Sequence, residues 1–176
     1  MALESKQSVC IKCGDIHLTD TTGVYNNPDN LTGYGTPNED FGDLTPYTAA
    51  FTSPKATTPV YTLDLYASPP TPDADDHYEY VITQEQLGYL DQPDIPSGVW
   101  EVLITIGFEE KLQRVFATGD IQRRITKCIC CSGLSNLWLD YDLKGAIALF
   151  KCHKYEQAQK MMDQLYRDTA ACCDCQ

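Results

Sequence analysis

The stretch Val99-Trp-Glu-Val-Leu-Ile-Thr-Ile-Gly-Phe108 has the strongest strand pattern in the chain. Apolar side chains alternate with the polar Glu101 and Thr105, and a period of two is typical of a strand with one buried face. A second apolar run at residues 112–117 follows the turn-like residues 109–111, so we expect the two runs to pair as a hairpin. The side chains expected on the buried face of the first strand are Trp100, Val102, Ile104, Ile106 and Phe108.

The composition of the chain changes near this hairpin. All ten prolines of the 176-residue chain lie at or before Pro96, and seven of its nine cysteines lie at or after Cys128. Proline lacks the backbone N–H and fixes φ, so it is excluded from helix interiors and from central strands. We therefore expect an α+β fold, with a front part rich in strands and loops and a back part made of helices.

The front part is expected to be an antiparallel β-sandwich or β-barrel in residues 1–118. Strand patterns separated by Pro- and Gly-containing turns favour these architectures over alternating βαβ units. Residues 19–46 are rich in turn residues, and we expect a long arm-like loop that either packs through its aromatic side chains or orders on a partner. Thr83-Gln-Glu-Gln86 matches a capping box and predicts a short helical turn that ends at Gly88. The remaining strands are expected at residues 9–18, 47–53, 60–67 and 79–83.

The back part is expected to be a Cys-rich domain, a small helical bundle in residues 119–176. Apolar residues recur near helical spacing in residues 120–139 and 140–151, and Gly133 is expected to break or bend the first helix. Residues 155–172 form the clearest helical pattern, and the short step before them predicts an antiparallel helical hairpin. The apolar stripe of this last helix is interpreted as bundle core rather than as a groove for a partner. It consists of Tyr155, Ala158, Met162, Leu165, Thr169 and Cys172.

Charge is divided as unevenly as composition. Residues 1–107 contain three Lys/Arg and sixteen Asp/Glu, a net charge of −13, whereas the last 69 residues contain ten and nine, a net charge of +1. The chain lacks the basic footprint of a nucleic-acid-binding protein, so we expect no direct sequence-specific nucleic-acid binding. The basic residues of the back part are expected to form solvated helix faces, or a surface that meets the acidic front part of another copy in a homo-oligomer.

The N-terminal residues and the lack of long apolar runs indicate the cellular compartment in which we expect the protein. Its first seven residues include the charged Glu4 and Lys6 and lack the apolar core of a secretory signal, and no run is apolar enough to span a membrane. We therefore expect no membrane partner and a reducing cytosol, where cysteines are more often thiols or metal ligands than disulfides.

The nine cysteines include three Cys-x-x-Cys pairs, which are Cys10/Cys13, Cys128/Cys131 and Cys172/Cys175. On a turn or at a helix end, this spacing places two thiolates on one side, as a tetrahedral Zn²⁺ requires. The last two pairs are the expected four-thiolate site for a structural zinc, which would tie the start of the helical domain to the C-terminus. The first pair is the alternate in place of one of them. Unbridged thiols and disulfides remain open alternatives.

No catalytic pattern accompanies these features. The sequence contains no P-loop, dinucleotide glycine motif, nucleophile elbow or His-Glu-x-x-His motif. A thioredoxin-type Cys pair should follow a strand and open a helix in a βαβ unit, whereas Cys10 and Cys13 fall within a predicted strand. We expect a protein that is not an enzyme, with no catalytic and no cofactor-binding residues.

Three short motifs carry a family resemblance. They are Asp20-Thr-Thr-Gly-Val-Tyr25, Gly33-Tyr-Gly-Thr-Pro-Asn38 and Ile95-Pro-Ser-Gly-Val-Trp-Glu-Val102. With the Cys-rich helices and the helical hairpin, the chain resembles small proteins of crAss-like tailed phages, which infect Bacteroides-type gut bacteria. The resemblance implies a structural virion protein assembled in the host bacterial cytoplasm. It would be a ring subunit at the neck or tail, connecting portal and tail.

The implied partners are further copies of the chain, the portal, and other neck and tail proteins. The resemblance carries over no catalytic residue. A zinc-stapled adaptor module that binds another protein is the alternative function that the cysteines leave open.

Overall fold

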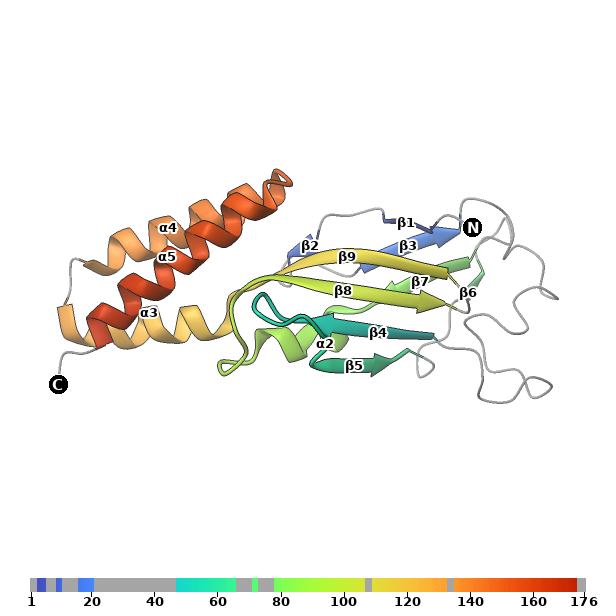
Figure 1. Cartoon of the computed structure of the whole chain (residues 1–176), viewed down its shortest axis with the longest axis horizontal. Coiled ribbons are helices and arrows are strands. Elements are labelled where there is room, and N and C mark those ends of the chain that lie inside the picture. Colours follow the sequence, from blue (N-terminus) through green and yellow to red (C-terminus); the bar gives the residue numbers. More distant parts are fainter. Residues whose placement is uncertain are drawn as a thin grey trace.

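The molecule is elongated, with its strands toward one end and the long helices of the described chain at the other (Figure 1). Its fold is of the α+β class, as the separation of prolines from cysteines predicts. The computed structural model describes residues 3–5, 9–10, 16–20, 47–65, 71–72, 78–106, 109–132 and 135–173.

Within these residues, one sheet consists of β2 (Val9–Cys10), β9 (Glu109–Ala117), β8 (Gly98–Ile106), β4 (Tyr47–Thr52) and β5 (Tyr61–Asp64), in this spatial order. The hairpin prediction is confirmed, because β8 and β9 pair antiparallel from Gly98 opposite Ala117 to Ile106 opposite Glu109. The predicted turn at residues 109–111 is wrong, since these residues are paired in β9. A strand with one face toward solvent accepts charged side chains, so the charged residues 109–111 are compatible with a strand as well as with a turn.

The inner face of β8 lies at the centre of the sheet core. Trp100, Val102 and Ile104 are at most 1% exposed, as their alternation predicts. The indole Nε1 of Trp100 donates to the carbonyl oxygen of Pro96 at 2.7 Å, so the one polar atom of this side chain is satisfied. The side chain of Ile106, and Phe108, lie outside the described residues. Side chains from β4, β9, the residue after β5 and the segment after β7 complete this core, among them Ala49, Phe51, Leu65, Leu87, Leu90 and Val115.

A second sheet consists of β1 (Leu3–Ser5), β3 (Ile16–Asp20), β7 (Tyr78–Ile82) and β6 (Thr71–Pro72), in the order β1-β3-β7-β6. Its described pairs are antiparallel, whereas β2 pairs parallel with β9, which departs from the predicted antiparallel pattern. The single strand predicted at residues 9–18 is wrong, because β2 and β3 belong to different sheets. Residues 19 and 20 belong to β3 rather than to the predicted loop, and the rest of that loop lies outside the described residues.

The capping box predicted at Thr83 is confirmed. The backbone N–H of Gln86 donates to Thr83 Oγ1 at 3.2 Å, and the backbone N–H of Thr83 donates to Gln86 Oε1 at 2.9 Å. These bonds start α2 (Gln84–Leu87), which passes into the 3₁₀ helix η2 (Gly88–Asp91). The short segment brings Leu87 and Leu90 onto the sheet core.

The helical end consists of α3 (Gly119–Ser132), α4 (Ser135–Lys151) and α5 (Tyr155–Cys173). Four residues of the stripe predicted on the last helix are buried: Ala158, Met162, Leu165 and Thr169 are at most 1% exposed. Ala158, Met162 and Leu165 pack with residues of α3 and α4, and Tyr155 is partly buried against them, so the interpretation as core is confirmed for these positions. The side chain of Cys172 lies outside the described residues. Gly133 lies outside the described residues.

The turn between α4 and α5 is a Schellman motif. His153 N–H donates to Phe150 O and Lys154 N–H donates to Leu149 O, both at 2.9 Å. His153 takes the left-handed position of this motif with φ of 59°, where glycine is the usual residue. The motif satisfies two terminal carbonyls of α4 and reverses the chain, which confirms the predicted helical hairpin.

Candidate functional site

A buried carboxylate joins the sheet to the helices. Asp120, in the first turn of α3, is 9% exposed, and its Oδ1 accepts the backbone N–H of Ser97 at 2.7 Å. The hydroxyls of Ser97 and of Tyr166, on α5, donate to the same oxygen. Ile121 N–H donates in turn to Ser97 Oγ at 3.0 Å. Because the shared acceptor lies in α3 and its donors come from Ser97, just before β8, and from Tyr166 on α5, this cluster fixes the helices against the sheet.

The cluster changes the acidity of Tyr166. Burial raises the pKa of its phenol above the ordinary value, and the hydrogen bond to Asp120 and the charge of that carboxylate raise it further. Lys55 and Arg124 lie over the same ring, at 5.3 and 5.0 Å from its centroid. Because burial and Asp120 raise the pKa, the proton on this phenol is held more tightly in the folded state than in the unfolded chain.

We expect alkaline pH to weaken the fold through this phenol. The contribution of Tyr166 is complete below the ordinary tyrosine pKa of about 10 and is lost as the pH rises above it, because the unfolded chain then releases the proton first. Denaturant unfolding across this range should show a steeper fall in the free energy of unfolding for the wild type than for Tyr166→Phe. Equal slopes for the two proteins would contradict this assignment.

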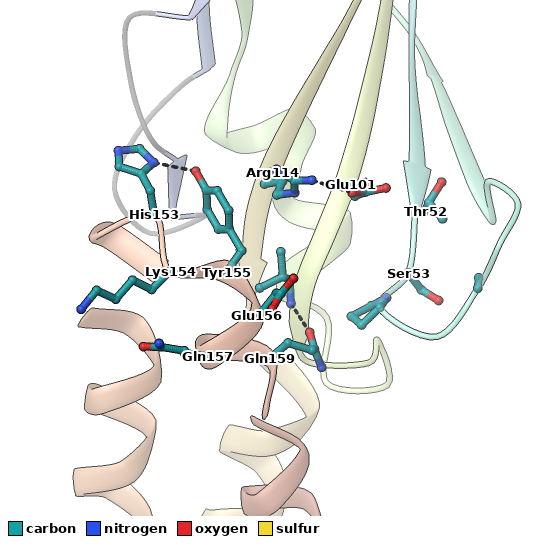
Figure 2. Close-up of a pocket in the computed structure, with 13 residues that line it drawn as sticks. Thr52, Ser53, Glu101, Arg114, His153, Lys154, Tyr155, Glu156, Gln157 and Gln159 are labelled. Atoms are coloured by element: carbon teal, nitrogen blue, oxygen red, sulfur yellow. Dashed lines mark hydrogen bonds and ion pairs between the residues drawn. The ribbon is translucent and has the colours of Figure 1, made fainter. Parts of the chain in front are cut away.

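An open cavity of about 710 Å³ lies between the sheet and the turn that joins α4 to α5 (Figure 2). His153 Nδ1 lies 2.6 Å from the hydroxyl of Tyr155, and Arg114 lies over the ring of Tyr155 at 5.0 Å from its centroid. Arg114 also pairs with Glu101 at 3.3 Å. The rest of the wall comes from the end of β4 and from the first turn of α5, and includes Thr52, Ser53, Pro54, Glu156, Gln157 and Gln159.

Several polar side chains of this cavity bond to groups of its own wall. His153 bonds to Tyr155 rather than to a serine hydroxyl or a thiol, and the Arg114–Glu101 pair is nearly half exposed on both sides. Gln159 Oε1 accepts the backbone N–H of Val99 at 2.9 Å, so this side chain joins α5 to β8. In the part of the wall that the structure describes, no serine hydroxyl or thiol is hydrogen-bonded to His153.

The predicted metal ligands are partly described. Cys128 is buried in α3, and its thiol donates to the carbonyl oxygen of Thr169 on α5 at 3.6 Å. Cys131 and Cys172 lie in the last turns of α3 and α5, and their side chains, like Cys175, lie outside the described residues. The alternates are likewise undecided, because Cys10 is described only as backbone of β2 and Cys13 is not described. Among the described residues, His, Cys, Asp and Glu form no group of three or more that could hold a metal ion.

An exposed apolar patch on α4 was missed from the sequence. We call it the α4 patch; it consists of Leu137, Trp138 and Tyr141, which are 70%, 72% and 69% exposed. Residues three and four apart share a helix face, so these side chains are neighbours. The opposite face of α4 is buried through Leu139, Leu143, Ala146 and Phe150. The sequence signal for this patch is that apolar residues occur on both faces of α4, although only one face can pack against the core.

No protein-family model, curated protein or solved structure matches this chain. In the described part of the chain, no helix has the length and apolar character needed to cross a membrane.

Proposed function

We propose that this chain is a structural protein that assembles with further copies of itself into a ring. The observation that carries this proposal is the α4 patch. Trp138 and Tyr141 are strongly exposed on a helix whose other face is packed into the core. Tryptophan and tyrosine are enriched at the centres of protein interfaces, where they contribute most of the binding free energy.

The surroundings of the α4 patch fit an interface centre. Asp140 and Lys144 form an ion pair one helical turn apart beside it, and both side chains are more than half exposed. A polar rim around an apolar centre is the usual composition of a protein interface. The other strongly exposed large apolar side chains of the described residues are Val60 and Leu112, which are single residues in the sheet region.

The division of charge favours a copy of the same chain as the partner. Residues 1–107 carry a net charge of −13 and the rest a net charge of +1, so the helical end of one copy avoids repulsion when it meets the acidic end of the next. Such a head-to-tail contact joins two different surfaces, and a contact of this kind closes into a ring when its rotation permits.

The finer architecture is part of the proposal. The two sheets would form a β-sandwich whose core contains Trp100 and its neighbours. Helices α3, α4 and α5 would form a small bundle with the α4 patch on its surface. The α+β fold and the interior position of the α5 stripe support this arrangement.

We further propose that the ring belongs to the neck or tail of a phage virion, as the family resemblance implies. Its partners would then be the portal and other neck and tail proteins, and its location would be the virion after assembly in the bacterial cytoplasm. A protein of this kind would have no catalytic role.

The test is native mass spectrometry of the full chain at several concentrations. We expect a closed oligomer for the wild type, and a loss of association of about 30-fold or more for Trp138→Lys, the effect of removing a hot-spot residue. Val60→Lys is the matched control, because it places the same charge at an exposed apolar position away from α4. A wild type that stays monomeric, or a Trp138→Lys variant that assembles like the wild type, would overturn the proposal.

A second candidate function is a zinc-stapled adaptor that binds a different protein. The contact between Cys128 and Thr169 favours it, because it brings the cysteine-bearing ends of α3 and α5 together. In the same measurement, this function predicts a monomer or dimer that carries one zinc ion.

A further inference from the structure

The open cavity and the α4 patch lie at opposite ends of α4. The patch occupies the first two turns of this helix, whereas the cavity wall includes the turn that follows its last residue, from His153 to Gln157. A helix of 17 residues is about 25 Å long, so the two surfaces cannot meet within one copy. They can meet between copies, as a head-to-tail contact requires.

The size of the α4 patch favours a concave partner. A large aromatic side chain buries roughly 150–250 Å², so the patch supplies about 400 Å², which is about half of the roughly 800 Å² per partner in a stable interface. A flat contact of this size would be weak. A hollow surrounds the side chain that enters it and adds contacts with its rim, and hot-spot residues of interfaces lie in such pockets.

The cavity has the volume and the lining for an aromatic side chain. Its volume of about 710 Å³ falls in the range of about 300–1,000 Å³ that is typical of ligand pockets. Pro54, Ala56 and Val99 give the wall an apolar part, and each remains partly exposed. Glu101 and Gln157 supply hydrogen-bond acceptors in the same wall. An indole or a phenol has an apolar ring and a polar tip, so it fits a wall of this mixed character.

The cavity continues onto the solvent-facing side of the five-stranded sheet. Directly opposite residues of paired strands share a face, so Thr52, Glu101 and Arg114 form one row of this side, and all three line the cavity. The next row contains Leu103 opposite Leu112. Leu112 is 47% exposed and Leu103 is partly exposed, so this row extends the apolar surface beyond the cavity.

Charge favours a contact between this side of the sheet and α4. The described part of the sheet side has three carboxylates and one guanidinium, a net charge of −2, from Asp64, Glu101, Glu110 and Arg114. Helix α4 has two Asp and two Lys, but Lys144 and Lys151 are on the exposed stripe that carries the patch, whereas both Asp are less exposed. The surfaces are therefore complementary in charge as well as in shape.

We propose that Trp138 of one copy enters the cavity of the next copy, with the rest of the α4 patch against the row of Leu103 and Leu112. This inference rests on the proposed ring assembly and names the second surface of its head-to-tail contact. Lys144 and Lys151 then lie over the acidic side of the sheet. Each copy uses its patch on one neighbour and its cavity on the other, so the contact repeats around a ring.

The test mixes two variants of the full chain that each damage one surface. Trp138→Lys loses the patch and keeps the cavity, whereas Thr52→Arg keeps the patch, fills part of the cavity and adds a charge that repels Lys144. Native mass spectrometry should show that each variant alone associates about 30-fold more weakly than the wild type, or worse. An equimolar mixture should form a 1:1 dimer and nothing larger, because the patch and the cavity that remain on this dimer are both damaged.

Two further variants control the test. Thr126→Arg adds the same charge at an exposed position of α3 outside the cavity, and it should assemble like the wild type. Gln157→Arg blocks the cavity from the α5 side at an exposed position, so the result does not depend on the folding of Thr52→Arg alone. Far-UV circular dichroism of each variant checks the fold.

Tryptophan fluorescence gives a second readout. The chain has two tryptophans, of which Trp100 is 1% exposed and Trp138 is 72% exposed. Docking takes the indole of Trp138 out of water, and indole emits at shorter wavelength in an apolar environment. The emission of the wild type should therefore shift to shorter wavelength as its concentration rises. In the mixture, Trp138 is contributed by the Thr52→Arg copy alone.

The outcomes separate this inference from the ring assembly. A wild type that assembles, with Thr52→Arg and Gln157→Arg assembling equally well, would overturn the docking and leave the ring. A mixture of folded variants that stays monomeric would also overturn the docking, because the patch then meets a different surface, such as a second α4 patch. The same follows if Thr126→Arg weakens assembly as much as the cavity variants. A wild type that stays monomeric would overturn both.

Discussion

Gly119→Ala is expected to be the most destabilising single methyl addition in the described part of the chain. A Cβ atom at this position would overlap the carbonyl oxygen of Gln92 and lie 3.0 Å from its carbonyl carbon and 3.1 Å from Asp91 O. These are backbone atoms, so they cannot move aside as a side chain can. Either α3 or the segment after η2 must shift, and both carry residues of the buried core. We expect a loss of about 4 kcal/mol or more, the range of severe core strain.

Two other glycines provide a graded control. A Cβ at Gly88 would meet nothing within 4 Å, so Gly88→Ala should leave the stability nearly unchanged. A Cβ at Gly145 would lie 3.1 Å from the sulfur of Met161, a flexible side chain that can adjust, so Gly145→Ala should cost an intermediate amount. Thermal unfolding measures the series, and Gly119→Ala should lower Tm by about 10 °C. A Gly119→Ala variant as stable as Gly88→Ala would contradict the described junction.

Asp120→Ala is expected to have the second large effect. It removes the acceptor shared by the backbone N–H of Ser97, the hydroxyl of Ser97 and the hydroxyl of Tyr166. Hydrogen bonds to a charged acceptor contribute more than neutral ones, and a buried donor left without a partner is costly. The variant also loses a negative charge in the first turn of α3, where the helix dipole favours it. We expect a loss of about 3 kcal/mol or more in the free energy of unfolding.

Conservative variants separate the parts of this effect. Tyr166→Phe removes one donor to the carboxylate and one acceptor of the Ser97 N–H, which Asp120 still accepts, so it should cost about 1 kcal/mol. Asp120→Asn keeps the shape but loses the charge and should fall between the two. Denaturant unfolding of the three variants under identical conditions gives the ranking. If Asp120→Ala were no more destabilising than Tyr166→Phe, the carboxylate would not be the shared acceptor that joins sheet and helices.

Much of the fold follows from patterns between residues that are close in the sequence. The alternation around Trp100 predicted β8 and its buried face, the Thr83 motif predicted the start of α2, and the spacing of Ala158, Met162 and Leu165 predicted α5 and its interior face. These features depend on strand or helix periodicity and on caps, which act over a few residues. The same reasoning misplaced the β8–β9 turn, because Glu109 and its neighbours are charged yet paired in a strand.

The candidate sites were predicted less completely. The spacing of Cys128 and Cys131 indicated a pair of thiols, but only the contact with Thr169 places α3 and α5 at one level. The exposure of Trp138 could not be predicted from the sequence. Apolar residues occupy both faces of α4, and the sequence does not decide which face packs against the core.

The sequence by itself determined the local elements of this protein: where strands alternate, where α2 is capped, and which stripe of α5 is apolar. Only the tertiary structure decided that Asp120 accepts from Ser97 and Tyr166, 23 and 46 residues away, and that Gly119 must lack a side chain beside Gln92. The physical reason is that periodicity and capping arise between near neighbours along the chain. Shared acceptors, close backbone approaches and exposed faces arise from segments that meet only when the whole chain has packed.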